Sequence, residues 1–315
     1  MAIVDAGNLF FKKDQLSPGV TTEIASVTAD IILAAFNEIG CDAFSPGSQD
    51  FALGLEFLLK MEKNANFPFV SANIKSATTG IHLFRPYQVV SKGGVSLGFI
   101  GLASQFTHPD LLIDDPIQAL KGIVEEVANQ VDIVVLLFNS EEKDILELQR
   151  SDLPIDMVYR SKSRKRSNDG GSKTIPVYSA GDRGKYLYDV TIAVNDKSLS
   201  FVDVTAQENI LKIATQRLDR MQKNHPEGTD LKVLFKDDPQ TLARVTNYER
   251  QVDEANHALS NAINSFTLTQ HELNKTIVDK PKILKIIDAG KLKIAEFSAP
   301  QPAVPFTDPH AGHNH

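Results

Sequence analysis

The sequence predicts a layered α/β protein with a large sheet that is partly antiparallel. Strand-like and helix-like segments alternate from residue 3 to about residue 206, as in sheets that are covered by helices. An unbroken apolar run at residues 131–138 has the composition of a central strand covered on both faces. Short polar segments at 92–94 and 195–197 each separate two strand-like runs, as hairpin turns do.

Helices are expected where apolar residues recur at intervals of three and four. Thr21 or Thr22 provides a cap for the first helix, which runs to about residue 39 and ends at Gly40. The other helices of the α/β region are expected at residues 53–63, 116–130 and 141–150.

Strands are expected where short apolar runs lie between turn signals. The chain opens on such a run at residues 3–7, so we expect its numbering to start at a trimmed mature end or a misplaced start. The last two strands, 186–194 and 199–204, are predicted to pair with each other across residues 195–197. The others are expected at residues 42–44, 69–74, 87–90, 95–102, 131–138, 155–159 and 175–180.

The pattern changes after about Ala206, beyond which no strand is predicted. Residues 207–223 and 241–266 carry apolar residues at helical spacing, and a shorter helix is expected at about 281–296. The first two favour an antiparallel pair packed on the main domain, with an intermolecular coiled coil as the alternative. The chain is therefore divided into an α/β domain, a helical appendage (a hairpin or arm) and a disordered tail that contains histidines, at residues 1–205, 206–298 and 299–315.

Composition excludes several classes of protein. The chain of 315 residues is 42% hydrophobic with a net charge of -7, so no general attraction to nucleic acid is expected. Its single cysteine, Cys41, rules out an internal disulfide and a cysteine-based zinc site. No segment reaches the roughly 18 apolar residues that a membrane span needs, and no secretory signal is recognisable at the start.

Several segments between residues 3 and 205 match one known family in order and spacing. Residues 4–10 resemble a strand and turn that normally end in Gly-Asp, and residues 37–51 resemble a helix, strand and turn that lead to Gly-Asn-His-Glu-Phe. The chain thereby resembles the calcineurin-like metallophosphoesterase superfamily, in its 5′-nucleotidase branch. The resemblance implies an αββα sandwich. The other matching segments are residues 67–74, 93–102, 131–137, 155–159 and 179–187.

The resemblance also implies which residues stand at the family's metal site. The family hydrolyses phosphate esters with two divalent ions held by oxygen and nitrogen ligands. Here Asn8 replaces the aspartate that bridges the ions, Ser48 replaces an asparagine ligand, and Gln49 replaces the histidine that assists the leaving group. Asp50, in the same turn, belongs to this set of vestigial positions.

The remaining metal positions are altered too. They fall at Asn139, Lys162 and Arg164, and the family's first Asp-x-His motif would lie upstream of Ile3. A neutral amide cannot supply an anionic bridging oxygen, and a cation repels a metal ion. We therefore expect the fold without hydrolysis: a pseudoenzyme that binds or assembles, with no catalytic residue and no cofactor. The alternative is an active metal-dependent phosphoesterase whose ligands align differently and whose two Mn-, Zn- or Fe-type ions use a motif ahead of this chain.

Two further sites are candidates. Lys162 and Arg164, with Arg160, begin the densest basic run and form a candidate anion site in place of the metals, although a solvated mobile loop explains the same run. The tail histidines His310, His313 and His315 have the spacing of a weak metal chelator or of a fortuitous cluster.

Partners and location follow from the resemblance and the helices alone. The helical appendage is a candidate surface for a protein partner or for self-association. The 5′-nucleotidase branch is usually exported, which implies a periplasmic or extracellular protein.

Overall fold

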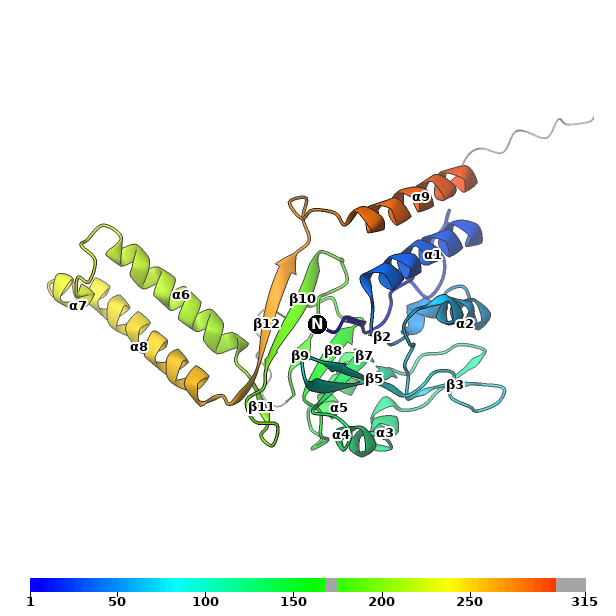
Figure 1. Ribbon diagram of the computed structural model, residues 1–315, viewed down its shortest axis with the longest axis horizontal. Helices are drawn as coiled ribbons and strands as arrows, with labels where there is room; N and C mark the ends of the chain where they lie inside the picture. Colours follow the sequence, from blue (N-terminus) through cyan, green and yellow to red (C-terminus); the bar gives the residue numbers. More distant parts are fainter. Residues whose placement is uncertain (168–174, 299–315) are drawn as a thin grey trace, which may run out of the picture.

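The computed structural model describes residues 1–167 and 175–298 of the chain. An α/β body lies to the right in Figure 1, and a pair of long helices extends from it to the left. The body consists of packed sheets with helices on their outer faces. This is the layered α/β class that the sequence predicts.

The larger sheet has five strands in the order β4-β5-β7-β8-β9. β4 and β5 form an antiparallel hairpin, and the other neighbouring strands are parallel. The carboxyl ends of β5, β7 and β8 therefore meet at one edge, where Ala103, Asn139 and Ser161 are paired in register. The strands are β4 (Tyr87–Lys92), β5 (Val95–Ala103), β7 (Ile133–Asn139), β8 (Met157–Ser161) and β9 (Val177–Tyr178).

β7 is the central strand that the apolar run predicts. All of its residues are buried, and alternate side chains enter different cores. Val134, Leu136 and Phe138 pack against helices on one face, while Val135 and Leu137 pack against the second sheet. The helices on the first face are α3 (Pro116–Lys121), α4 (Val124–Ala128) and α5 (Glu142–Leu148).

The single helix predicted at residues 116–130 is divided into α3 and α4. α3 ends at Gly122, and Ile123 leaves the helical region with φ −134° before α4 begins. Glycine has a low helix propensity, which accounts for a break at this point.

The amino-terminal segment builds a further layer. β1 (Val4–Asp5) pairs in parallel with β2 (Ala43–Phe44), and α1 (Thr22–Ile39) connects them. The predicted strand at 69–74 is mostly irregular, because Phe69 and Val70 make only isolated bridges. The remaining elements of this segment are η1 (Ser48–Phe51), α2 (Leu55–Asn64), β3 (Ile74–Ser76) and β6 (Leu111–Ile113), of which β3 and β6 form a two-stranded antiparallel sheet.

The second main sheet corrects two predictions. β10 (Tyr186–Ala193) and β11 (Phe201–Asp203) do not pair with each other, because β12 (Asn264–Glu272) lies between them. The predicted hairpin across 195–197 is therefore wrong, and so is the absence of strands after Ala206. Asn264 stabilises this arrangement, since its side-chain oxygen accepts bonds from Asn195 and Asp196 in the turn.

Phe266 shows why β12 belongs to the body. The sequence pattern placed Phe266 in the helical heptad, but the helix ends at Asn261. Phe266 is instead 1% exposed in the core and stacks on Phe201 at 4.8 Å between ring centroids. Burying one aromatic ring in a core stabilises a fold by about 2 kcal/mol or more, which favours the strand over a longer helix.

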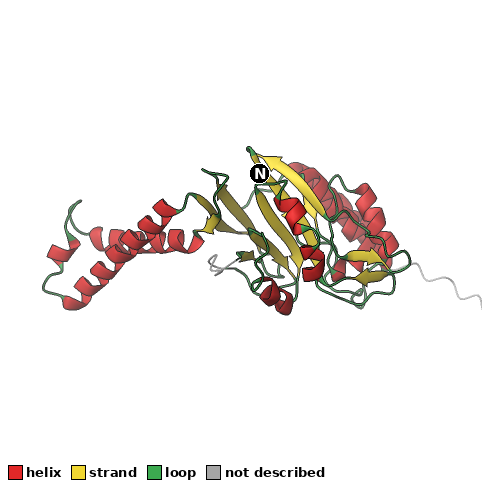
Figure 2. Cartoon of the chain, turned by 90° about the horizontal axis from the view of Figure 1, so that it is seen from below, coloured by secondary structure: helices red, strands yellow, loops and turns green. Residues whose placement is uncertain are grey.

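The arm is an antiparallel helical pair, as predicted, but it projects from the body and is not packed on it. α6 (Thr205–Gln222) and α8 (Pro239–Asn261) run side by side and are joined through the short α7 (Leu231–Leu234). Figures 1 and 2 both show the pair projecting away from the body. Division of the chain at residue 205 stays a proposal, because β12 returns the chain to the body after the arm.

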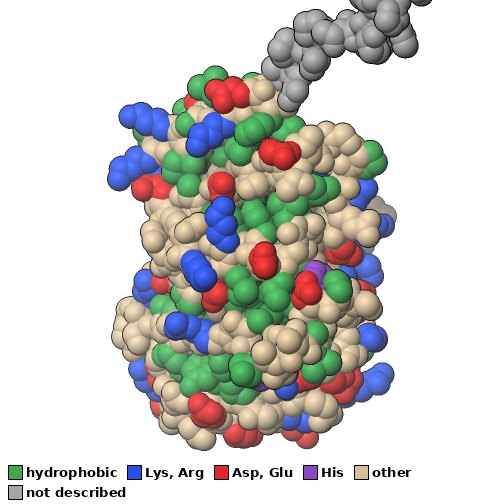
Figure 3. Space-filling view, turned by 90° about the vertical axis from the view of Figure 1, so that its right-hand side faces the viewer, with side chains coloured by type: hydrophobic (Ala, Val, Ile, Leu, Met, Phe, Trp, Pro, Cys, Tyr) green, Lys and Arg blue, Asp and Glu red, His purple; other side chains and the backbone are tan. Residues whose placement is uncertain are grey.

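α9 (Pro281–Ser298) packs on α1 in the antiparallel sense. Lys280 forms an ion pair with Glu38 near the end of α1, and Gly290 lies directly against Ile31 further back. Figure 3 shows the side of the body that carries α1 and α9, where hydrophobic side chains lie in groups between charged ones. None of the described helices is long and apolar enough to cross a membrane.

Candidate functional site

The predicted site residues meet at the carboxyl edge of the parallel strands. Asn8 follows β1, Gly47 precedes η1, Asn139 ends β7 and Lys162 follows β8. These residues come from distant parts of the sequence, yet a β-carbon built on Gly47 would lie 2.4 Å from Asn139 Cγ and 2.5 Å from Asn8 Oδ1. Asn8 and Asn139, two of the predicted site positions, therefore both lie against the same glycine.

The space above Gly47 is filled by these two amides. Only a glycine fits there, since real β-carbons do not approach other atoms to 2.5 Å. Gly7 is equally confined: a β-carbon on it would lie 2.7 Å from the Ser45 carbonyl oxygen, and its φ of 111° suits glycine. The edge is packed by backbone and amide groups.

Hydrogen bonds connect the amides to their surroundings. Asn139 Nδ2 donates to Ser161 Oγ at 2.8 Å, and Ser161 donates in turn to the Ala6 carbonyl oxygen at 2.6 Å. Asn8 Oδ1 accepts a bond from the Gln49 backbone N–H at 3.2 Å. The side chains at these predicted site positions therefore hold three loops together.

Ser48 and Gln49 bond to the loop that follows β1. Ser48 Oγ donates to Asp14 at 3.0 Å, and the Gln49 amide, oriented to satisfy both of its ends, donates to the carbonyl oxygens of Phe11 and Lys12. Both side chains therefore hold the loop that follows β1.

Asp50 is a buried clamp for the same loops. Its carboxylate is 0% exposed and accepts backbone N–H groups of Asn8, Phe10 and Gly47 at 2.7, 2.9 and 2.8 Å. Burial raises the pKa of Asp50 to about 6, although these bonds act in the opposite direction. Because its carboxylate oxygens already accept three hydrogen bonds, the role of Asp50 is structural.

Asp5 is a titratable group that the sequence analysis missed. Burial raises its pKa to about 7, the bond from the Gly7 N–H lowers it, and the nearby Asp50 adds to the rise. The sequence signal was an acidic residue at the end of a strand. In the described part of the chain, the Asp5 carboxylate accepts the Gly7 N–H at 2.8 Å.

The backbone is strained on both sides of the edge. Among the residues that the structure describes, only Asn8 and Lys162 combine a side chain with a positive φ, at 62° and 60°. Asparagine tolerates this left-handed conformation, whereas for lysine it costs roughly 1 kcal/mol. Strain of this kind is typical of functional sites, and here it marks two altered metal positions.

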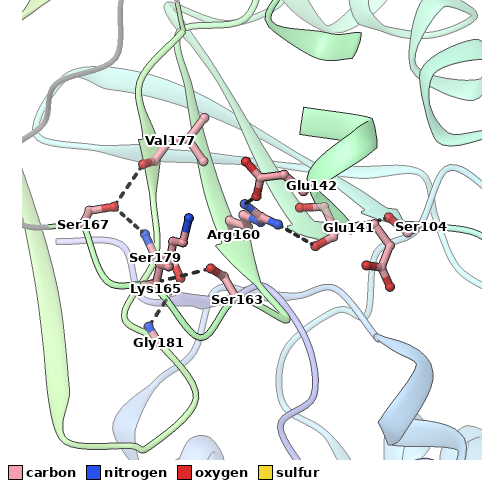
Figure 4. A network of polar contacts seen from close by, with 11 residues as sticks. Ser104, Glu141, Glu142, Arg160, Ser163, Lys165, Ser167, Val177, Ser179 and Gly181 are labelled. Atoms are coloured by element: carbon pink, nitrogen blue, oxygen red, sulfur yellow. Dashed lines mark hydrogen bonds and ion pairs between the residues drawn. The ribbon is translucent and has the colours of Figure 1, made fainter. Parts of the chain in front are cut away.

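Two of the three candidate anion-binding residues, Arg160 and Lys162, already have anionic partners. Arg160 donates to Glu142 at 2.7 Å and to the Ser140 carbonyl oxygen at 3.2 Å, as Figure 4 shows in part. Lys162 pairs with Glu141 at 2.6 Å. These bonds lower the pKa of both glutamates, so the four charges neutralise one another. Arg164 is exposed and makes no ion pair within the described chain.

The described residues do not fit a dinuclear metal centre. No group of three or more His, Cys, Asp or Glu side chains is close enough to hold an ion anywhere in residues 1–167 and 175–298. The edge supplies amides and a hydroxyl that bond to each other, and its one fully buried carboxylate is taken up by backbone N–H groups. The tail residues His310, His313 and His315 lie outside the described residues.

Comparison with known proteins agrees with this fold. A scan against models of protein families finds no match. In sequence, the chain is 37% identical to a 5′-nucleotidase of Vibrio cholerae over 99 residues, which are 29% of this chain and 18% of that protein. It is 32% identical to the 5′-nucleotidase of Mus musculus over 170 residues, which are 49% of this chain and 28% of that protein. The matched segments thus span less than a third of either relative.

Solved structures show the same architecture. A calcineurin-like phosphoesterase from Bacillus subtilis, YfkN, superposes with a TM-score of 0.59 at 14% identity and covers 94% of this chain and 84% of that one. The fold is thus that of the calcineurin-like phosphoesterases, and part of the sequence is similar to 5′-nucleotidases. Within it, the sequence relatives are named 5′-nucleotidases.

Proposed function

We propose that this chain is a phosphoesterase-fold protein that does not hydrolyse phosphate esters at this edge and acts by binding. The observation that carries the proposal is the close approach of both Asn8 and Asn139 to Gly47. These side chains occupy, with neutral amides, the space where the family's resemblance implies metal ligands. Their bonds to Gln49 and Ser161 would have to break before an ion could be held.

The chemistry of the edge supports the same conclusion. A pair of metal ions lowers the pKa of an attacking water from about 15.7 to near 7. Only a base at the edge could compensate in part. Asp5, with a pKa of about 7, accepts the Gly7 N–H, and the other candidate with a raised pKa is Asp50. Its oxygens point to three backbone N–H groups instead of to open space, so it cannot receive a proton from a water without losing those bonds.

Binding is assigned to surfaces outside the filled edge. The arm projects from the body, and we keep self-association or a protein partner on the arm as part of the proposal. A test must leave β12 in place, so the variant shortens the arm from its tip, where α7 joins α6 to α8. Light scattering then compares the mass in solution of this variant with that of the unaltered chain. Export to the periplasm or the cell exterior is likewise proposed on the resemblance, to be tested by cell fractionation.

Metal analysis and turnover test the main proposal. The purified chain is incubated with Mn²⁺, desalted and examined by mass spectrometry for bound metal, and hydrolysis of a chromogenic phosphodiester is followed with added Mn²⁺. We expect far less than one ion per chain and no turnover above buffer. About two ions per chain with metal-dependent turnover would instead support an active phosphoesterase, as in a dinuclear site. Metal content and turnover are measured independently. Circular dichroism of the same sample shows whether the chain is folded, so that misfolding is not mistaken for a lack of activity.

A further inference from the structure

Two neighbouring loops present a group of exposed cations beside the filled edge. We call it the basic surface, and within the described chain none of its side chains takes part in an ion pair. It is separate from Arg160 and Lys162, whose charges are neutralised by Glu142 and Glu141. The basic surface consists of Arg164, Lys165, Arg166, Arg183 and Lys185.

Hydrogen bonds hold the first of the two loops up to residue 167. Ser167 Oγ donates to the Val177 carbonyl oxygen at 3.1 Å and accepts the Ser179 N–H at 3.0 Å. Ser163 Oγ donates to the carbonyl oxygen of Lys165 at 3.2 Å, which tightens the turn between them. Figure 4 shows these bonds around Lys165. These hydrogen bonds position the backbone that carries Arg164, Lys165 and Arg166.

Arg166 joins the two loops. Its guanidinium lies 4.1 Å from the centre of the Tyr186 ring, and its stem packs against Gly181. Gly181 has φ 76°, and a β-carbon on it would lie 3.1 Å from Arg166 Cγ. Arg183 and Lys185, both exposed, follow Gly181 in the second loop within four residues of this contact.

The nearby acids leave the surface with a positive balance. Asp182 is the one acid in residues 160–167 and 181–187, and Glu272 stands opposite Tyr186 on β12. Two acids against five unpaired cations leave a net positive patch on a chain whose total charge is -7.

We propose that the basic surface binds a short acidic segment of a partner protein. Its exposed cations are distributed over two loops, at residues 164–166 and 183–185, which suits several carboxylates spaced along a chain better than one phosphate. The ring of Tyr186 is already covered by Arg166, so it is not free to stack on a nucleotide base. A membrane or a long nucleic acid would also meet the acidic remainder of the molecule, whereas a short peptide contacts only the patch. The inference goes beyond the proposed function and holds whether or not the edge binds metal.

Fluorescence anisotropy with a labelled oligo-glutamate peptide tests the proposal on the full chain. We expect saturable binding at about 20 mM salt that is lost near 0.5 M, where the Debye length is only a few ångströms. The variant Arg164→Glu, Lys165→Glu, Arg183→Glu should weaken binding at least about tenfold. It leaves Arg166 on Tyr186, and circular dichroism should match that of the unaltered protein.

A control variant with the same change in net charge locates the effect. Lys212→Glu, Arg220→Glu and Lys223→Glu lie on the exposed side of α6 and at its end. This variant should bind the peptide nearly as well as the unaltered chain. Equal weakening by both variants, or no binding at low salt, would overturn the proposal. Tighter binding of a single-stranded oligonucleotide or of anionic vesicles would overturn the choice of an acidic peptide, as would saturation by inorganic phosphate at lower concentration.

Discussion

Asn139 on β7 and Ser161 on β8 face each other across neighbouring parallel strands, and the Asn139 amide donates to the Ser161 hydroxyl at 2.8 Å. The Ser161 hydroxyl in turn donates a hydrogen bond to the Ala6 carbonyl oxygen beside β1. One pair of polar side chains thus joins the large sheet to the amino-terminal strand, at a position where the family resemblance implies a metal ligand.

Removing the Ser161 hydroxyl should destabilise the protein. Ser161→Ala leaves the Asn139 amide and the Ala6 carbonyl oxygen without their partner at a largely buried position, which costs about 1–3 kcal/mol. Urea denaturation followed by circular dichroism measures this change. Ser163→Ala, in the loop that follows β8, loses only an exposed bond and should change the free energy of unfolding by less than about 0.5 kcal/mol. Equal effects of the two variants would contradict the role of Ser161.

A side chain at position 47 should not be tolerated. In Gly47→Ala the new methyl group meets Asn139 and Asn8 at about the positions of their side-chain atoms, which overpacks the edge by about 1–3 kcal/mol. Gly122→Ala is the control, because its φ is −72° and its nearest neighbour is the Ala119 carbonyl oxygen at 3.3 Å. Combining Gly47→Ala with Asn8→Gly and Asn139→Ala should cost less than the sum of the separate changes. Strict additivity would show that the amides do not fill this space.

Asp5 should make the protein less stable as the pH rises. The pKa of Asp5 is about 7 in the folded chain against 3.8 as its ordinary value, so the folded state holds the proton more tightly. The resulting stability is present in full below pH 4 and is lost as the pH rises through about 7. Asp5→Asn cannot lose a proton, and its oxygen can still accept from Gly7. It should therefore be more stable than the unaltered chain at pH 8, by roughly 1–2 kcal/mol, and similar at pH 4.

Asp132 provides a control of opposite sign for the pH experiment. The bond from Lys197 and the bonds from Ser96 lower its pKa to about 2. Its contribution is present above pH 4 and is lost as the pH falls toward 2, so Asp132→Asn should destabilise the protein at pH 8. Urea titrations from about pH 2 to pH 8 compare the three proteins, so that both pH windows are covered. A stability difference between Asp5→Asn and the unaltered chain that does not depend on pH would refute the assignment.

A larger residue at position 290 should release α9 from α1. A β-carbon on Gly290 would lie 2.1 Å from Ile31 Cδ1, so Gly290→Leu forces the helices apart. Trypsin should then cleave faster at Lys291 and Lys293, while the melting of the body changes little. Ala289→Leu, on the exposed side of the same helix, should leave the cleavage rate unchanged. Faster cleavage in both variants would mean that α9 is loosely held in any case.

The sequence predicted the body well where local patterns decide the structure. The apolar run of β7 and the cap at Thr21 reflect short-range preferences, and both are confirmed. β12 was missed although residues 264–268 alternate between buried and partly exposed side chains. Phe266 also fitted the heptad that precedes it, and nothing local distinguishes a helix that continues from a strand that returns to a distant sheet.

The site could be predicted only in part, for a related reason. The family resemblance brought Asn8, Gln49 and Asn139 together correctly, because each follows a recognisable strand or turn. The ion pairs of Arg160 and Lys162 with Glu142 and Glu141 depend on the register between β7 and β8, which two distant segments determine together. The sequence therefore predicted Arg160 and Lys162 as anion-binding residues, because the glutamates that neutralise them could not be identified from it. Whether Arg164 contributes to binding stays a prediction.

The position of β12 between β10 and β11 has a consequence for how the chain folds. Tyr186 pairs with Glu272, so the sheet cannot be completed until the whole arm has been synthesised. Contacts so distant in sequence slow folding, because the intervening loop must close before they form. The helical pair shortens that search: once α6 and α8 associate, Thr205 and Asn261 are brought close together, and β12 emerges beside the strands that it must join.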